Sequence, residues 1–210
     1  MTLPKVLAAA ALPMLWSNWA LPALGMNIRA RSLSSAAFAT TYALVFKGDP
    51  NWVSPRGLRA GTAVAAVLTT GYVAALTIPS LRRHLAELED RSPEVHIAEW
   101  AGAHIPGGTV YSEELVYRAT LTPLLERSLG RPGSWLGALL FGLAHIRPAH
   151  NAGDPIPATV AITGGAGLIF DALYRHTGSA TAPALAHLAL NAGGALTPVS
   201  ARRMTRRTVA

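Results

Sequence analysis

The chain has 210 residues, of which half are hydrophobic and 14% are charged, with a net charge of +7 and no cysteine. An ordinary soluble domain carries about 25% charged residues, so this composition excludes that class and indicates a membrane-embedded protein. Because cysteine is absent from the sequence, the chain forms no disulfide and uses no thiol nucleophile.

Two uncharged stretches are long enough to cross a membrane by themselves. They run from Val6 to Ile28 and from Ala60 to Leu81, about 22 residues each, whereas about 20 apolar residues cross a bilayer core. We expect both to be transmembrane helices. A cleaved secretory signal is the alternative for the first, because Lys5 precedes it and small residues follow at Ala23-Leu24-Gly25. Its length favours a retained helix.

Later apolar stretches are shorter or contain polar residues. Three have about 15 residues, which is marginal for a span and requires flanking residues or a re-entrant path. These are residues 32–46, 132–146 and 155–170. Residues 176–201 are long enough but contain His187 and Asn191, which must face the protein interior in a span. The sequence therefore predicts an all-α, polytopic transmembrane bundle of roughly six to eight helices with a polar site inside it.

Basic residues flank the apolar stretches. They are Arg29, Arg31, Arg56, Arg59, Arg82 and Arg83, followed in the tail by Arg202, Arg203, Arg206 and Arg207. This distribution is typical of the positive-inside rule and argues against a nucleic-acid partner. We expect an integral protein of the plasma membrane whose cytoplasmic C-terminus contacts anionic membrane lipids.

The chain divides into four segments within one integrated membrane domain. Residues 1–80 lack embedded charge and are interpreted as a transmembrane scaffold, and residues 81–104 as an amphipathic linker at the membrane interface. A solvated surface helix explains the linker pattern equally well. Residues 105–198 are predicted to form the catalytic helices, because they carry the polar motifs, and residues 199–210 form a basic tail.

Three short motifs place polar groups one helical turn apart in apolar sequence. They are Glu113-Glu114-Leu-Val-Tyr117-Arg118, Phe141-Gly-Leu-Ala-His145 and His187-Leu-Ala-Leu-Asn191. Residues four apart in a helix share a face, so each motif presents its polar groups on one side. Because ionisable side chains are costly in a low-dielectric surrounding, this repeated pattern predicts a chemically active site.

The first motif combines two carboxylates with a guanidinium. Residues 105–108 (Ile-Pro-Gly-Gly) are predicted to break the chain, with Ser112 as the N-cap of a new helix. Glu113 and Glu114 then lie in its first turn, and Arg118 lies four residues after Glu114. One carboxylate tied to Arg118 and another free to take a proton suit acid–base chemistry.

Each motif alone also has a purely structural explanation. A Glu-Glu-x-x-x-Arg sequence is commonly a solvated helix face, and His or Asn in a membrane helix commonly makes a helix–helix hydrogen bond. Outside the motifs, we expect Asp171 and Arg175 to form an i,i+4 ion pair and His104 to be solvated. A non-enzymatic membrane protein, such as a bacteriocin immunity factor or a partner-binding scaffold, is therefore the alternative to an enzyme.

In their order and spacing, the three motifs resemble the CAAX protease and bacteriocin-processing family, also called the CPBP or Abi family. This family of intramembrane proteases includes the CAAX prenyl endopeptidases. The resemblance covers residues 109–196 and includes a Thr177-Gly-Ser179 turn ahead of the last motif. Tyr117 stands where the family usually has Phe, and the N-terminal half resembles nothing specific.

The resemblance implies a membrane endopeptidase, a hydrolase that cleaves a peptide bond in a peptide or membrane-protein substrate. It implies that Glu113 is the general base that activates water and that Glu114 and Arg118 support it. His145 would bind and orient that water.

The last motif would act on the scissile carbonyl. The resemblance implies that His187 and Asn191 stabilise the oxyanion, and an imidazole N–H and an amide are both competent donors for this role. Phe141 and Tyr117 are expected to line the site.

Family members have also been described as metalloproteases. Glu113, His145 and His187 would then be the metal ligands, with zinc as the candidate metal and an open position for water. The sequence contains no His-Glu-x-x-His run. We favour glutamate catalysis without a cofactor and retain zinc as the alternative.

Overall fold

The computed structural model describes residues 2–88 and 93–209, and these residues form helices joined by short turns, without a strand. The N-terminal half contains α1 (Leu3–Leu15), the π-helical η1 (Trp16–Ala20), α2 (Leu21–Ala23), α3 (Ile28–Phe46), α4 (Pro55–Thr77) and α5 (Pro79–Glu87). The C-terminal half contains α6 (Ile97–Glu99), the π-helical η2 (Trp100–Tyr111) and η3 (Glu114–Leu121), α7 (Thr122–Leu129), α8 (Pro132–Leu143), α9 (Ile146–Ala152), α10 (Ile156–Thr177) and α11 (Thr181–Val209). The predicted all-α bundle is confirmed.

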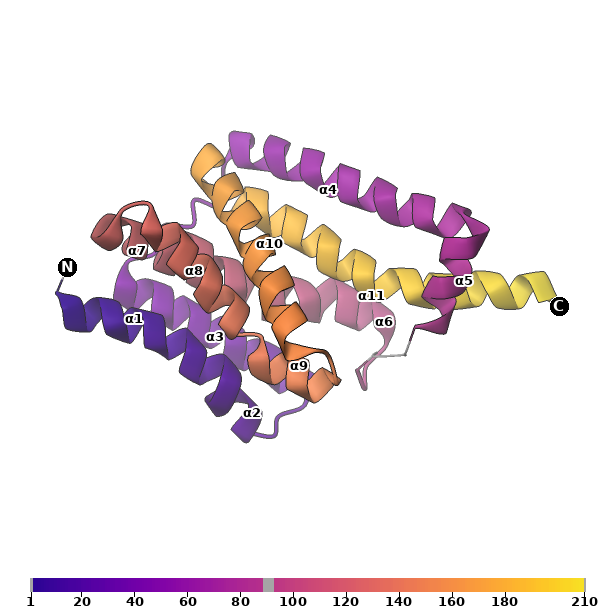
Figure 1. The fold of residues 1–210 in the computed structure, drawn as a ribbon, viewed down its shortest axis with the longest axis horizontal. Helices are drawn as coiled ribbons and strands as arrows, with labels where there is room; N and C mark the ends of the chain where they lie inside the picture. The colour runs from indigo at the N-terminus through magenta and orange to yellow at the C-terminus, as the bar shows by residue number, and fades with distance from the viewer. Residues whose placement is uncertain (1, 89–92, 210) are drawn as a thin grey trace.

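The helices pack around the segment that carries the first polar motif. Helices α4 and α11 lie side by side along one edge of the molecule, and α8 and α10 pack against each other (Figure 1). Segment η2 contacts α3 and α11, and η3 contacts α3, α7, α8 and α10. The first motif is therefore held by helices from both halves of the chain.

Small residues allow α4 and α11 to approach closely. A Cβ atom on Gly61 would lie 2.9 Å from the Cα atom of Ala182, and one on Gly193 would collide with the ring of Tyr72. The Tyr72 hydroxyl donates a hydrogen bond to the Leu190 carbonyl oxygen at 2.9 Å. Small residues at the contact and polar bonds across it are typical of helix packing in membranes.

Among the described residues, three helical stretches are long and apolar enough to cross a membrane, namely Leu3–Ala23, Pro55–Thr77 and Ile156–Thr177. The first two confirm the two transmembrane helices predicted from the long uncharged stretches. The third contains residues 156–170, which belong to a stretch whose length is marginal for a span. Helix α11 is less apolar, because it contains His187 and Asn191 and includes the arginines of the basic tail. Large apolar side chains on these helices are exposed, as lipid-facing residues are, for example Val67 at 72% and Ile169 at 61%.

The central helix is continuous from Ile97 to Leu129 and is π-helical over most of its length. Pro106 lies inside η2 and lacks the N–H that an α-helical turn needs, and π-turns are one way a helix accommodates such a loss. Ser112 is an interior residue whose hydroxyl donates to the Gly107 carbonyl oxygen at 3.3 Å. The predicted chain break at 105–108 and N-cap at Ser112 are therefore wrong, because Pro106 lies in a widened helix.

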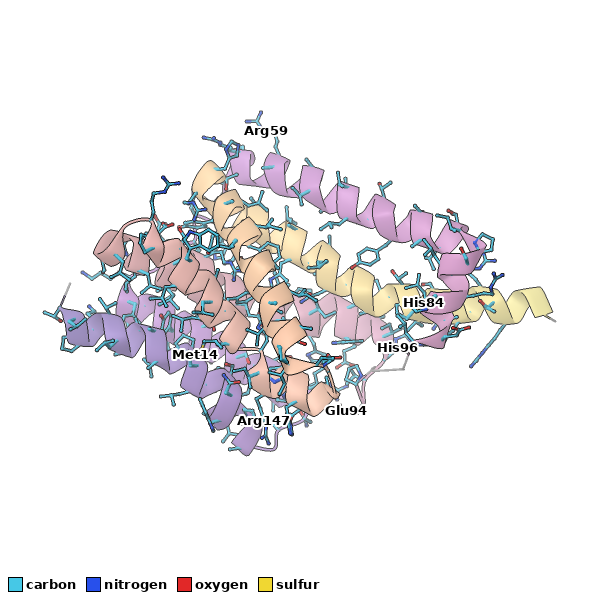
Figure 2. All side chains as sticks on the ribbon, viewed as in Figure 1. Met14, Arg59, His84, Glu94, His96 and Arg147 are labelled. Atoms are coloured by element: carbon cyan, nitrogen blue, oxygen red, sulfur yellow. The ribbon has the colours of Figure 1, made fainter. Side chains whose placement is uncertain are left out.

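Part of the predicted interfacial linker and tail lies outside the described residues, namely 89–92 and the side chain of Arg207. The described part of the linker begins with α5, which packs on α11. In Figure 2, His84 of α5 and His96 just before α6 lie toward the C-terminal part of α11, and Arg147 and Glu94 lie at the lower edge near α2 and α9.

Candidate active site

Glu113 and Glu114 are adjacent on the central helix and therefore face different surroundings. Successive residues of a helix point roughly 100° apart around its axis. The Glu113 side chain is 25% exposed and lines a cavity, whereas Glu114 is completely buried. The two carboxylates of the first motif are thus separated into one that reaches the cavity and one that faces the protein interior.

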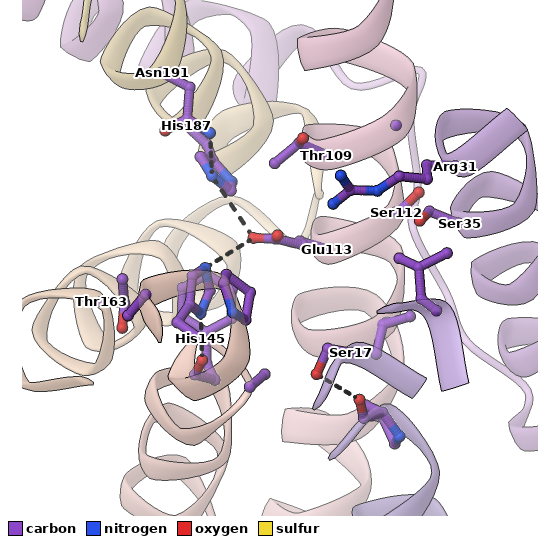
Figure 3. A pocket seen from close by; sticks show the side chains of 18 of the residues that line it. Ser17, Arg31, Ser35, Thr109, Ser112, Glu113, His145, Thr163, His187 and Asn191 are labelled. Carbon is purple, nitrogen blue, oxygen red and sulfur yellow. Dashed lines mark hydrogen bonds and ion pairs between the residues drawn. The ribbon is translucent and has the colours of Figure 1, made fainter. Parts of the chain in front are cut away.

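The three motifs meet at the carboxylate of Glu113. Its Oε2 atom lies 3.9 Å from Nε2 of His145 and 3.8 Å from Nε2 of His187. Figure 3 shows the Glu113 side chain reaching between the two imidazoles, which come from the turn between α8 and α9 and from α11. Both distances exceed a hydrogen bond, so the three side chains leave room for a small group between them.

Each imidazole uses its Nδ1 atom to fix its orientation. His145 Nδ1 lies 2.8 Å from the Phe141 carbonyl oxygen, and His187 Nδ1 lies 2.7 Å from Glu114 Oε1. A carbonyl oxygen and an ionised carboxylate only accept hydrogen bonds, so each Nδ1 carries the hydrogen. In a neutral imidazole Nε2 then has a free lone pair. Both neutral rings therefore face Glu113 as hydrogen-bond acceptors.

Asn191 supports this tautomer of His187. Its Nδ2 atom lies 3.1 Å from His187 Nε2, which is the distance of an amide donating to the ring nitrogen. With its hydrogen on Nδ1, a neutral His187 has no hydrogen on Nε2 to donate to an oxyanion. An imidazolium form of His187 carries a second hydrogen on Nε2 and regains that capacity.

Arg118 is buried beneath the site among carboxylates and aromatic rings. Its Nε atom lies 3.6 Å from Glu114 Oε2 and 3.6 Å from Asp171 Oδ1, and its guanidinium carbon lies 4.0 Å from the centre of the Phe141 ring. At these distances Arg118 makes ionic and cation–π contacts rather than hydrogen bonds. Arg118 thus compensates two buried carboxylates, of which the sequence reasoning identified only Glu114.

Asp171 is the buried partner that the sequence reasoning missed. The predicted ion pair between Asp171 and Arg175 is wrong: Asp171 is 2% exposed beside Arg118, and Arg175 Nη1 pairs with Glu126 Oε1 at 3.0 Å. The preceding residue, Phe170, stacks on His187 with ring centres 4.9 Å apart. Asp171 is the single acidic residue in the apolar sequence of α10, and such a residue is a signal for an inward-facing functional position.

His104 is also buried, contrary to the expectation that it is solvated. Its Nδ1 atom lies 2.9 Å from the Ser32 hydroxyl and its Nε2 atom lies 3.1 Å from Glu99 Oε1. The Arg29 guanidinium binds Glu99 through two hydrogen bonds, and it lowers the pKa of Glu99 to about 2. This ionised carboxylate joins the start of α3 to η2 at the wall of the cavity.

The cavity has a volume of about 750 Å³ and is lined by both halves of the chain. Its lining includes Trp16, Arg31 and Phe38 as well as Glu113, His145 and His187. The expected lining residues Tyr117 and Phe141 also border it, and their rings meet edge to face with centres 4.9 Å apart. The cavity gives an apolar ligand access to the carboxylate of Glu113.

Glu113, His145 and His187 have the donor types that zinc uses, but their spacing is wide. A tetrahedral zinc site with bonds of 2.0–2.1 Å places its ligand atoms roughly 3.3 Å apart, which is less than the observed 3.8 and 3.9 Å. Within residues 2–88 and 93–209, no group of three or more His, Asp or Glu side chains is spaced to hold a metal ion. Binding of zinc would require these side chains to move together.

Residues 100–193 match the family model described as Rce1-like, type II CAAX prenyl endopeptidase. These 94 of the 210 residues are therefore similar to that family, over somewhat less than half of the chain. The segment contains all the residues predicted to be catalytic, from Glu113 to Asn191. No curated protein and no solved structure matches the chain. The Rce1-like segment and the three apolar helices together indicate an integral membrane protein with the general activity of an intramembrane protease.

Proposed function

We propose that the chain is an intramembrane endopeptidase in which Glu113 activates the attacking water. The convergence of His145 Nε2 and His187 Nε2 on Glu113 Oε2 carries this proposal. A water at this point donates one hydrogen to Glu113 Oε2 and the other to His145 Nε2, because His187 Nε2 already accepts from Asn191, and it directs an oxygen lone pair toward the cavity. General-base catalysis of this kind contributes about 10²- to 10⁴-fold to a rate.

The proposed reaction proceeds through a tetrahedral intermediate. Glu113 takes a proton as the water oxygen bonds to the scissile carbonyl carbon, and the carbonyl electrons move to the oxygen. When the intermediate collapses, the carbon–nitrogen bond breaks and Glu113 returns its proton to the leaving amine. His145 orients the water, because its hydrogen bond to the Phe141 carbonyl oxygen fixes its ring.

His187 and Asn191 are proposed to stabilise the oxyanion. In its imidazolium form His187 keeps the hydrogen bond from Nδ1 to Glu114 and donates from Nε2 toward the developing charge. Asn191 then contributes its amide N–H groups. Arg118 holds Glu114 from below and is itself paired with Asp171, and neither residue is proposed to touch the substrate.

Metal-independent catalysis remains our preferred hypothesis, and zinc held by Glu113, His145 and His187 is the alternative. A bound zinc ion would supply an activated water, and these donor types are suitable for it. The wide spacing of the three side chains favours direct activation by Glu113.

We further propose a plasma-membrane location with the basic C-terminus in the cytoplasm, and peptides or membrane proteins as substrates. Residues 1–80 are the proposed scaffold, 105–198 the catalytic unit, and 81–104 and 199–210 the interfacial linker and basic tail. The scaffold also contributes Trp16, Arg31 and Phe38 to the cavity wall.

The proposal is tested by identifying peptides that the wild type releases from a membrane-protein extract and Glu113→Ala does not, using mass spectrometry. The experiment is repeated with a chelator. Release that depends on Glu113 and survives the chelator supports glutamate catalysis, and release abolished by the chelator supports the zinc alternative. If no release depends on Glu113 although the variant folds, the non-enzymatic scaffold is the better hypothesis.

A further inference from the structure

Asn18 is a buried amide of the first apolar helical stretch, Leu3–Ala23, and its side chain reaches the turn between α8 and α9. Its Nδ2 atom donates to the Leu143 carbonyl oxygen at 3.2 Å, and its Oδ1 atom accepts from the Arg147 N–H at 2.9 Å. These two partners lie two residues before and two residues after His145. A single amide therefore holds both sides of the turn that carries this histidine.

The turn at His145 interrupts helical hydrogen bonding, which leaves backbone groups in need of a partner. Helix α8 ends at Leu143 and α9 begins at Ile146, and His145 between them has φ −94° and ψ 5°, outside α-helical values. The last carbonyl groups of a helix and its first N–H groups have no partner within that helix. In lipid no water replaces the missing partner. Asn suits this position, because its side chain both donates and accepts hydrogen bonds.

The other hydrogen bonds of the turn are local. The His145 N–H donates to the Gly142 carbonyl oxygen at 3.0 Å, and the His145 carbonyl oxygen accepts from the Ala149 N–H at 2.9 Å. The imidazole Nδ1 atom lies 2.8 Å from the Phe141 carbonyl oxygen. Local bonds set the shape of the turn, whereas the bonds from Asn18 set its position relative to another helix.

Asn18 is itself held in place within the π-helical η1. Its Nδ2 atom also lies 3.2 Å from the Met14 carbonyl oxygen, one turn earlier. The neighbouring Trp16 ring stacks on the Phe38 ring of α3 with centres 4.6 Å apart, and α3 packs on η2 and η3 of the central helix. Segment η1 also contacts α9, beside which the end of the first helix lies (Figure 1). Contacts thus lead from the central helix through the N-terminal half to the turn.

From these contacts we infer that Asn18 is a positioning residue, which sets the place of His145 Nε2 relative to Glu113. This inference rests on the proposed function, in which His145 orients the attacking water. Asn18 does not line the cavity, so it acts through the turn and not on the substrate. It also lies outside the matched residues 100–193, so the N-terminal half contributes to the geometry of the site.

The kinetic test replaces Asn18 by Leu, which has a similar shape but neither donates nor accepts a hydrogen bond. We expect kcat on a peptide that the wild type cleaves to fall about 10- to 100-fold, because a misplacement of about 1 Å between reacting groups has an effect of this size. KM should change little. A wild-type kcat per folded molecule, with only a lower unfolding temperature, would show a merely structural role and overturn the inference.

Asn18→Ser is the second variant, for the case that Asn18→Leu does not fold. Its side chain is one atom shorter and cannot bridge both backbone groups, but it leaves room for a water that binds them. The same fall in kcat is expected. A wild-type kcat in Asn18→Ser, when Asn18→Leu yields no folded protein, would overturn the inference.

Asn51→Leu is the matched control. The Asn51 Nδ2 atom donates to the Gly178 carbonyl oxygen at 2.8 Å, so this residue also binds a helix-end turn through its amide, and it does not line the cavity. Its backbone φ is 40°, which Leu rarely adopts, so the control also loses stability. We expect a lower unfolding temperature with an unchanged kcat. An equal fall in kcat in both variants would mean that general destabilisation is the cause and would overturn the inference.

A spectroscopic measurement tests the position of His145 without cleavage. The protein is labelled with ¹⁵N-histidine, and His145→Gln and His187→Gln identify the two sets of imidazole signals by NMR. We expect the His145 Nε2 signal to shift in the Asn18 variants, while His187 keeps its wild-type signals because Glu114 holds its Nδ1. An unchanged His145 signal would overturn the inference. If the signal shifts but no peptide release depends on Glu113, Asn18 positions the turn and the proposed protease function fails.

Discussion

Glu114 Oε1 lies 2.7 Å from Nδ1 of His187, and the two residues are 0% and 4% exposed. This buried hydrogen bond joins the first and last motifs across 73 residues of sequence. It fixes which ring nitrogen of His187 carries the hydrogen and leaves Nε2 turned toward Glu113. The positions of the cavity groups therefore depend on a carboxylate that does not itself reach the cavity.

Replacing Glu114 by Gln is expected to reduce kcat by about 10²- to 10⁴-fold, because an amide can hold the wrong tautomer of a catalytic histidine. KM should change little, since Glu114 does not line the cavity. Steady-state kinetics that separate kcat from KM check this. A Glu114→Gln enzyme with wild-type kcat would contradict the proposed role of the hydrogen bond.

Replacing Asp171 by Asn is expected to lower the free energy of unfolding by about 1–3 kcal/mol, because buried Arg118 loses one of its two carboxylate neighbours. Arg175→Gln is the comparison, since its ion pair with Glu126 is partly exposed and contributes about 1 kcal/mol or less. Thermal unfolding in detergent measures both. Equal effects of the two substitutions would show that Asp171 does not balance Arg118.

Two glycines should respond oppositely to substitution by alanine. A Cβ atom on Gly133 would lie 2.6 Å from the Leu125 carbonyl oxygen, so Gly133→Ala should destabilise the contact of α8 with α7 by about 1–3 kcal/mol. Gly71 lies within α4 with no neighbouring atom within 4 Å, so Gly71→Ala should stabilise the protein by about 0.5–1 kcal/mol. The order of the two unfolding temperatures checks this prediction, and a stabilising Gly133→Ala would contradict the packing.

The contact between Arg29 and Glu99 should make stability depend on pH. The pKa of Glu99 is lowered from 4.5 to about 2 in the folded protein, mainly by the hydrogen bond from Arg29. A carboxyl with a lowered pKa stabilises the fold above its unfolded pKa, and this contribution is lost as the pH falls from about 5 to about 2. The difference in unfolding temperature between wild type and Glu99→Gln should therefore shrink over that range. A constant difference would mean that Glu99 is not responsible.

The all-α membrane architecture could be predicted because the sequence patterns that indicate it involve residues close together in the chain. Uncharged stretches of sufficient length identify α1 and α4, and i,i+4 spacing identifies pairs such as Glu114 and Arg118. The Thr177-Gly-Ser179 turn is also present, with Gly178 at a positive φ of 66° after α10.

The predictions that were wrong concern contacts between residues that are distant in sequence. Arg175 is the nearest basic residue to Asp171 along the chain, but packing of α10 against η3 brings Asp171 to Arg118. Residues 105–108 contain a proline and two glycines, which usually end a helix, yet the helix continues through them in π-helical form. The burial of His104 likewise depends on Ser32 and Glu99, which no local pattern connects to it.

The most direct test of the account is the cleavage rate of Glu113→Gln on a peptide that the wild type cleaves, measured at equal concentrations of folded protein. The substitution keeps the shape of the side chain that lies between His145 and His187 but removes its ability to take a proton. We predict a rate about 10²- to 10⁴-fold below that of the wild type, with an unchanged unfolding temperature. A Glu113→Gln protein that cleaves the same bond at the wild-type rate would contradict the central claim.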